Sequence, residues 1–425
     1  MTGAAPAAAR RIGWTDGKLA LRIDVAADGT AGVVLSPAGP GTDAPGVPLV
    51  DVVIAGEGRS WSGRRYAESV TGRRLRYRDH EEHDRGPWRQ LRVRLDDPVT
   101  GLGATVTYEL LPGHGVLRSE VTLSNHGPGP VTVESVTSFL AGLLPGPPDQ
   151  AVLADLDLLW AENDWIAEGR WQQRPLRDAL PDLNRAAHGA GSRGRFGLTS
   201  LGSWSTGTYL PMGALVSRRT GDTWAWQVEH NGAWHWQVGE WRPPDPADQA
   251  EQAYLALLGP ADSEHQWRTE LAPGSSFTTV PVMVAAASGG LESAVAALTA
   301  GRRAARRPHD DHRRLPVIFN DYMNTLSGDP ATGRLLPLIE AAARAGAEYF
   351  CIDAGWYAET GEHWWDTVGA WQPSASRFPG GITEVLDAIR AAGMVPGLWL
   401  EPEVVGVRSP VARQLPDGAF FSRAG

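Results

Sequence analysis

Hydrophobic and polar residues alternate with a period of two through much of the chain, up to about residue 290. Residues 104–110 show the pattern, and residues 116–124 and 131–139 repeat it. Turn-forming residues, such as the glycines and prolines of 125–130, separate these runs. Short alternating runs of this kind are typical of antiparallel sheets, so residues 1–290 are predicted to form a large β-sandwich domain.

A tryptophan-rich segment at residues 224–238 gives a more local prediction. Asn231-Gly232 lies near its middle, and this pair favours a tight hairpin turn. A three-residue loop sets Trp226 opposite Trp236 and gathers apolar residues on one face, so we expect this register. Two roles are open to the tryptophan rings, namely packing between sheets and contact with a sugar.

A helix is expected at residues 291–304, followed by an arginine-rich connector that extends to residue 314. The connector contains His309-Asp-Asp-His312, and a similar cluster, His80-Glu-Glu-His83, lies earlier in the chain. Neither cluster has a third ligand on an evident helix. We therefore interpret both as solvated charge clusters rather than metal sites.

From residue 315 the pattern changes to short apolar runs that alternate with amphipathic helices. The runs cover residues 315–319, 349–352 and 394–400. This alternation predicts a parallel sheet covered by helices, either doubly wound or part of a (β/α)8 barrel. The first strand-to-helix turn lacks G-x-G-x-x-G, which disfavours a dinucleotide-binding sheet. The residues at helical spacing are Leu335, Ile339 and Ala342 before Gly346, and Ile382, Val385, Leu386 and Ile389 before Gly393.

Each of these three predicted strands ends on polar side chains, namely Asn320-Asp321, Asp353 and Glu401. In a barrel they would lie at the carboxyl-terminal rim, where barrel enzymes have their active sites. Carboxylates beside aromatic rings favour a carbohydrate ligand, because sugar hydroxyls need acceptors and sugar C–H faces need flat apolar surfaces. The alternative is that Asp353 and Glu401 cap the segments that follow them. The loop from Asp353 to about Gly381 supplies the aromatic residues Trp356, Tyr357, Trp364, Trp365 and Trp371.

Composition and charge argue against several classes of protein. The net charge of −10 argues against a general phosphate-binding surface and hence against a nucleic-acid partner. No run of about 18 apolar residues is present, so no membrane span is expected. No apolar stretch follows Arg10-Arg11, as it would in a secretory leader. Cys351 is the single cysteine, which fits a reducing, cytoplasmic location.

Four stretches of the second half resemble the α-galactosidases of glycoside hydrolase family thirty-six. The resemblance implies an N-terminal β-supersandwich followed by a (β/α)8 barrel. It also implies hydrolysis of terminal α-galactosides with retention, by two carboxylates and without a metal or other cofactor. The stretches are residues 319–322, residues 345–356, residues 369–371 together with 377–381, and residues 393–403, the last being the most specific.

The resemblance assigns roles to individual residues. Asp353 matches the first acid of an Asp-Asp pair that binds the galactose hydroxyls, and Trp399 matches a tryptophan of the sugar pocket. Trp356 and Glu401 lie in the same motifs and are expected near the substrate. Two positions depart from the family pattern. Ala354 replaces the second acid and Tyr322 replaces a tryptophan, which changes the hydrogen bonds available to select galactose.

The 111 residues from Leu315 to Gly425 fall well short of the ~250 of a barrel. We therefore expect a truncated barrel of strands one to three at residues 315–425, preceded by a helix and basic linker at 291–314. The family's nucleophile and acid/base are expected beyond Gly425, so no catalytic residue is assigned in this chain.

Two other functions remain open. One is a related exo-glycosidase acting on α-N-acetylgalactosamine or β-L-arabinopyranose, which the alanine at position 354 favours. The other is a non-catalytic carbohydrate-binding protein. The expected partner is an α-galactoside oligosaccharide, and self-association into a homo-oligomer is left open.

Overall fold

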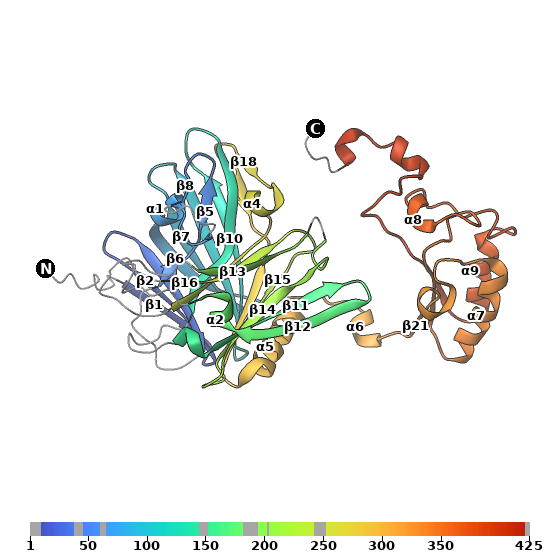
Figure 1. Ribbon diagram of the computed structural model, residues 1–425, viewed down its shortest axis with the longest axis horizontal. Coiled ribbons are helices and arrows are strands. Elements are labelled where there is room, and N and C mark those ends of the chain that lie inside the picture. The colour runs from blue at the N-terminus through green and yellow to red at the C-terminus, as the bar shows by residue number, and fades with distance from the viewer. Residues whose placement is uncertain are drawn as a thin grey trace. The chain divides into compact units, whose positions relative to one another are not determined.

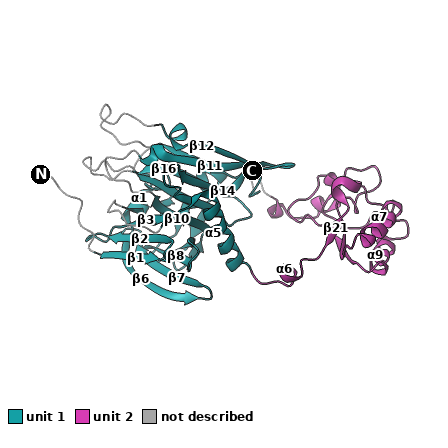
Figure 2. Cartoon of the chain, turned by 90° about the horizontal axis from the view of Figure 1, so that it is seen from below, with its two compact units in different colours: residues 1–306 teal, residues 307–425 magenta. Residues whose placement is uncertain are grey.

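The computed structural model describes residues 10–37, 46–59, 65–143, 152–181, 194–201, 204–241 and 252–420. It divides into two compact units, residues 1–306 and 307–425, which Figure 2 colours separately. The first unit consists mainly of strands, whereas the second contains a small sheet with helices (Figure 1).

The described part of the first unit consists mainly of two ten-stranded sheets, and nearly all of their pairings are antiparallel. Among the described residues the exception is the pairing of β3 with β10, which is parallel. The main path of the first sheet runs β1-β2-β3-β10-β17-β16-β13, with β4, β5 and β18 at its sides. Its strands are β1 (Arg10–Thr15), β2 (Leu19–Val25), β3 (Ala31–Pro37), β4 (Val47–Pro48), β5 (Val52–Ile54), β10 (Val131–Leu143), β13 (Arg195–Thr199), β16 (His235–Trp241), β17 (Gln252–Leu258) and β18 (Thr269–Leu271).

The second sheet runs β12-β11-β14-β15-β20-β9-β8-β7-β6, with β19 beside β9. The alternating runs identified in the sequence form β8, β9 and β10, which confirms the antiparallel sandwich in this region. The strands of this sheet are β6 (Arg76–Arg85), β7 (Trp88–Asp96), β8 (Leu102–Leu111), β9 (Val116–Asn125), β11 (Leu156–Asp164), β12 (Ala167–Pro175), β14 (Tyr209–Ser217), β15 (Thr223–Val228), β19 (Ser276–Thr278) and β20 (Val282–Ala287).

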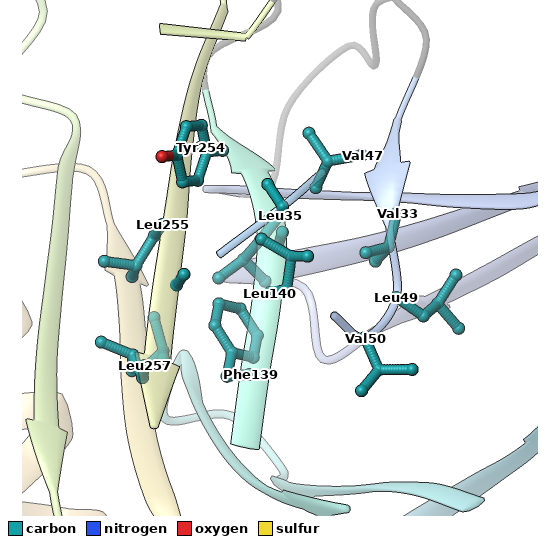
Figure 3. Packing of buried hydrophobic residues seen from close by; sticks show 14 of the residues in the cluster. Val33, Leu35, Val47, Leu49, Val50, Phe139, Leu140, Tyr254, Leu255 and Leu257 are labelled. Carbon is teal, nitrogen blue, oxygen red and sulfur yellow. The ribbon is translucent and has the colours of Figure 1, made fainter. Parts of the chain in front are cut away.

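A continuous apolar core contains side chains from both sheets. Figure 3 shows part of it, where Phe139 and Leu140 of β10 lie between Leu257 of β17 and Val33 of β3. All four of these side chains are fully buried. Burial of one such side chain contributes roughly 1.5–3 kcal/mol, so this interior accounts for much of the stability of the sandwich.

The predicted hairpin at residues 224–238 is wrong. β15 pairs with β14 and β20 in one sheet, whereas β16 pairs with β13 and β17 in the other, so the chain crosses between sheets at Asn231-Gly232. Trp226 and Trp236 do meet, but across the core, with ring centroids 5.0 Å apart and planes at 72°. Both rings are fully buried, so their role is packing between the sheets and not sugar binding.

Helix α5 (Gly290–Ala305) confirms the helix expected at 291–304 and packs on the second sheet. Gly301 allows a close approach, because a Cβ there would lie 2.5 Å from the sulfur of Met283 in β20. Among the described residues of the first unit, the other helices are short: α1 (Val70–Arg74), α2 (Leu176–Ala179), α4 (Asp262–His265) and a 3-10 turn at Val152–Asp155.

The second unit contains a parallel sheet in the order β21-β22-β23, formed by β21 (Ile318–Asn320), β22 (Tyr349–Ile352) and β23 (Val395–Leu398). The two long helices, α7 (Thr332–Arg344) and α9 (Ile382–Ala391), lie between successive strands. This confirms the predicted βαβαβ order. The remaining elements are α6 (Asp311–Arg314), the turn Tyr322–Leu326, α8 (Trp364–Thr367) and 3-10 turns at Pro410–Arg413 and Asp417–Ala419.

The core of this unit lies on one side of the sheet. Leu335, Ile339 and Ala342 of α7 pack with Phe350 and Ile352 of β22, as do Val385 and Ile389 of α9. Apolar side chains of the edge strands β21 and β23 remain exposed to solvent: Ile318 is 60% exposed and Val395 is 50% exposed. Strands of a complete barrel would be apolar and covered on both faces.

Candidate functional site

The candidate site lies at the carboxyl ends of the three parallel strands. The strand register sets Asn320, Cys351 and Gly397 side by side across the sheet. Asp353 follows directly on β22 and Trp399 directly on β23, and the N–H of Trp399 donates to the Ile352 carbonyl (2.9 Å). The sequence-predicted residues Asp353 and Trp399 therefore lie at one edge of the sheet, as expected from parallel strands.

Asp353 has a carboxylate whose orientation is fixed at both oxygens. Its Oδ2 accepts a hydrogen bond from Asn320 Nδ2 (2.5 Å), and its Oδ1 accepts one from the backbone N–H of Ala354 (2.7 Å). The side chain remains partly exposed. No helix starts immediately after Asp353, since α8 begins only at Trp364, so this carboxylate is not a helix N-cap. Each carboxylate oxygen has two acceptor sites, so room is left for ligand hydroxyls.

Trp399 stands in a group of aromatic rings contributed by the long loop after β22. Its ring makes edge contacts with Trp364 (5.6 Å, 82°) and Trp371 (6.0 Å, 66°). Trp371 in turn meets Tyr357 edge-on at 5.1 Å. The backbone of Trp371 has φ of +52°, a left-handed conformation that is uncommon for a large side chain and is often found at functional sites.

Trp356 does not lie where a sugar-stacking ring would be expected. It is only 3% exposed, and its Nε1–H donates to the carbonyl of Trp399 (3.0 Å). Its ring also packs on Tyr357 (5.5 Å) and Trp371 (6.1 Å). Contact between Trp356 and the substrate stays a prediction; in the structure the indole N–H of Trp356 supports the backbone of Trp399.

Tyr322 lies beside the same group. Its ring is half-buried and meets Trp364 edge-on at 5.9 Å, and its N–H donates to Asn320 Oδ1 (2.9 Å). The approach of Trp364 depends on Gly328, because a Cβ at that position would lie 2.5 Å from the indole ring. Ala354 is the other departure from the family pattern. It is more deeply buried than Tyr322, since only 2% of its surface is exposed.

Glu401 follows β23 and is partly exposed. Residues 402–403 form a turn, and the next helical turn begins only at Pro410. Glu401 therefore does not cap a helix, which was the alternative role for this residue. Partial burial raises the pKa of Glu401 to about 7, and the neighbouring carboxylate of Glu403 adds to this shift. Glu401 can therefore exchange a proton near neutral pH, a property found in many functional carboxyl groups.

Sequence reasoning missed the ion pair that holds the long loop. Arg377 is nearly buried and pairs with Asp329, which precedes α7, while its Nε–H donates to the carbonyl of Ala358. The Arg377 carbonyl also accepts the N–H of Thr332 at the start of α7 (3.1 Å). The partners Arg377 and Asp329 are 48 residues apart, and no local pattern signals such a contact.

Asp321 is a second residue whose role the sequence left undefined. Its side chain is buried, and its Oδ1 accepts the backbone N–H of Asp353 (2.7 Å). Burial, and to a lesser extent the charge of Asp353, raises the pKa of Asp321 to about 6. The only sequence signal was its place at the end of a predicted strand.

Within the described ranges, no group of three or more histidine, cysteine or acidic side chains is placed to hold a metal ion. The described helices include none long and apolar enough to cross a membrane.

Comparison with known proteins agrees with this architecture. Residues 60–193 match the glycosyl hydrolase family 36 N-terminal domain, and residues 276–423 match the melibiase family. A probable α-galactosidase C from Aspergillus terreus is 25% identical over 348 residues, which cover 78% of this chain and 42% of that protein. An α-galactosidase 1 from Pediococcus pentosaceus is 26% identical, with 77% of this chain and 40% of that protein covered. The chain thus spans less than half the length of these curated relatives.

Solved structures show the same fold. The family 36 α-galactosidase AgaA from Geobacillus stearothermophilus, determined in complex with raffinose, matches with a TM-score of 0.74 at 18% identity and covers 96% of this chain and 58% of that one. The α-galactosidase from Lactobacillus brevis matches with a TM-score of 0.70 at 19% identity, covering 95% and 56%. The matched domains follow one another along the sequence in the order sandwich, then barrel strands. The chain thus matches glycosyl hydrolase family 36 through its N-terminal-domain model and through α-galactosidase relatives.

Proposed function

We propose that the whole protein hydrolyses terminal α-galactosides of oligosaccharides with retention, and that this chain supplies its sandwich and the sugar-binding part of its barrel. The observation that carries the proposal is the oriented carboxylate of Asp353 at the carboxyl edge of the parallel sheet, where Trp399 follows the neighbouring strand and bonds to the backbone of Ile352. The similarity to glycosyl hydrolase family 36 supports the reaction class, and the names of the relatives, α-galactosidases, support a galactoside substrate.

Asp353 is suited to bind sugar hydroxyls. Two of its acceptor sites are filled by Asn320 and by the Ala354 amide, which leaves the others free to receive hydroxyl protons. Hydrogen bonds to an ionised carboxylate contribute roughly 1.5–3 kcal/mol each, so one such residue strongly favours a correctly placed hydroxyl. We propose that Trp399 and Tyr322 line the same sugar site, with Glu401 at its edge.

The two catalytic carboxyl groups of a retaining enzyme stand about 5–5.5 Å apart, and we place both on later barrel strands. The open side chains of β21 and β23 support this placement, because further strands would cover them. The 425-residue chain alone is therefore expected to show no turnover of 4-nitrophenyl α-galactoside above background. Turnover that disappears in Asp353→Asn would show that the catalytic groups lie in this chain.

The experiment that tests the function uses the full-length protein with raffinose and a panel of 4-nitrophenyl glycosides. We expect α-galactoside to be the preferred substrate over α-N-acetylgalactosaminide and β-L-arabinopyranoside. Asp353→Ala should lower kcat/KM about ten- to a hundredfold, from the ~1.5–3 kcal/mol of one charge-assisted hydrogen bond. The melting temperature should stay unchanged, because a partly exposed rim residue contributes little to the core.

The opposite result would favour a structural role for Asp353. If Asp353→Ala lowers the melting temperature while Asp353→Asn keeps full activity, the carboxylate only orders the loop. Preference for another glycoside in the panel would leave the family intact and replace the substrate. We also propose a reducing, cytoplasmic location, on the ground that Cys351 is the only cysteine of the chain.

A further inference from the structure

Asp321 stands directly after β21 and uses its side chain in an unusual way. An aspartate at the end of a strand commonly caps the turn that follows it. Asp321 makes no side-chain hydrogen bond to the turn Tyr322–Leu326. Its Oδ1 instead accepts the backbone N–H of Asp353, 32 residues further along the chain and directly after the neighbouring strand β22.

Asn320 and Asp321 together hold Asp353 at two independent points. Asn320 binds the carboxylate of Asp353 and thereby sets the direction of the side chain. Asp321 binds the amide of Asp353 at 2.7 Å and thereby sets the position of the backbone. The backbone N–H of Ala354 adds a third contact to the carboxylate. Few rotations remain open to Asp353, so it is preorganised for a ligand.

This arrangement has an energetic cost. Asp321 is 2% exposed, its Oδ2 has no hydrogen-bond partner among the described residues, and the charge of Asp353 is nearby. These conditions disfavour ionisation, and burial is the largest cause of the raised pKa of Asp321. An unsatisfied buried carboxylate oxygen in a native structure calls for an explanation, and such groups are often found where a site is held in one geometry.

We propose that Asp321 is a positioning residue, which fixes the backbone of Asp353 so that the Asp353 carboxylate meets the sugar hydroxyls in one orientation. This inference rests on the proposed function, in which Asp353 contacts the sugar. Asp321 itself does not touch the substrate and acts only through the amide of Asp353.

The test is a double-mutant cycle in the full-length protein, with kcat and KM for 4-nitrophenyl α-galactoside measured together with the melting temperature. Asp321→Ala removes the acceptor, and we expect kcat/KM to fall about ten- to a hundredfold, the range of one hydrogen bond to a charged group. Asp321→Asn retains an oxygen acceptor, and we expect it to stay within about threefold of the wild type. Asp321→Leu, which is closer in volume and also lacks the acceptor, replaces Asp321→Ala if that variant does not fold.

The cycle separates positioning from general stability. In an Asp353→Ala background the further loss from Asp321→Ala should shrink to less than about threefold, because the group that Asp321 positions is gone. A loss of full size in that background, or equal loss in Asp321→Asn and Asp321→Ala, would overturn the proposal. Asp387→Ala is the matched control: this acid is 65% exposed on α9, pairs with Arg390, and should leave kcat/KM unchanged.

Failure of this proposal differs from failure of the proposed function. If Asp353→Ala loses activity but Asp321→Ala does not, Asp353 binds the sugar and only the positioning role is wrong. If Asp353→Ala keeps full activity, the sugar-binding role of Asp353 is wrong, and the positioning proposal falls with it.

Discussion

Replacing Arg377 by methionine should loosen the long loop that carries Trp364 and Trp371. Arg377 is 4% exposed and makes two charge-assisted contacts, one to Asp329 and one to the carbonyl of Ala358. Each contributes roughly 1.5–3 kcal/mol, but Asp329 is 45% exposed and regains water when its partner is lost. We therefore take the low end for both and expect a loss of about 3 kcal/mol in the local stability of the loop.

The assay is amide hydrogen exchange, read on peptides from the loop between β22 and α9. The N–H of Ser374 donates to the carbonyl of Trp356, and that of Phe378 donates to the carbonyl of Ser374, so these amides report loop opening. A loss of about 3 kcal/mol corresponds to roughly a hundredfold faster exchange, at 1.4 kcal/mol per tenfold. Peptides from β8 and β9 in the first unit serve as the internal reference and should not change.

Arg334→Met is the matched control, because Arg334 pairs with the same Asp329 but is 58% exposed. Exposed ion pairs contribute roughly 0.2–1 kcal/mol, so exchange in this variant should rise less than about fivefold. Equal effects of the two substitutions, or wild-type exchange in Arg377→Met, would refute the reasoning that the buried arginine anchors the loop.

Three further predictions concern stability. Trp226→Ala should lower the free energy of unfolding, measured in urea, by about 3–5 kcal/mol, because Trp226 is fully buried. Trp165 is 75% exposed, so Trp165→Ala should change it by less than about 0.5 kcal/mol, and a larger effect of Trp165→Ala would contradict the assignment of Trp226 to the core. Burial raises the pKa of Asp51 from 3.8 to about 6, so its contribution to stability is present at low pH and is lost as pH rises from about 4 through 6, by roughly 3 kcal/mol. Asp51→Asn should therefore raise the melting temperature relative to the wild type at pH 7 but not at pH 4, and an equal shift at both pH values would exclude this cause. Gly328→Ala should lower the melting temperature, because Gly328 has φ of +84° and its new Cβ would lie 2.5 Å from Trp364; unchanged melting and unchanged exchange around Trp364 would count against that contact.

Local patterns predicted the elements of the second unit well. The apolar positions chosen by helical spacing in α7, namely Leu335, Ile339 and Ala342, are the buried ones. The glycines expected to stop the helices, Gly346 and Gly393, both have positive φ. These features depend on contacts within one helix turn or between successive elements, so the sequence contains enough information to find them.

Contacts between distant segments could not be predicted in the same way. The Asn-Gly pair at 231–232 marks a change of direction, but it does not reveal whether the next strand joins the same sheet or the opposite one. At the site, the pattern of parallel strands predicted that Asn320, Asp353 and Glu401 follow the carboxyl ends of neighbouring strands, and the family resemblance added Trp399. The bonds from Asn320 and Asp321 to Asp353 depend on side-chain orientation across two strands, which periodicity does not contain.

The crossing of the chain between β15 and β16 also bears on how the sandwich comes apart. Each of these strands is hydrogen-bonded on both sides within its own sheet, and a short covalent connection joins them. One sheet therefore cannot peel away while the other stays intact, because its departure would pull Trp226 or Trp236 out of the shared interior. Heat or denaturant should melt the two sheets in one concerted step, with tryptophan fluorescence and circular dichroism following the same curve.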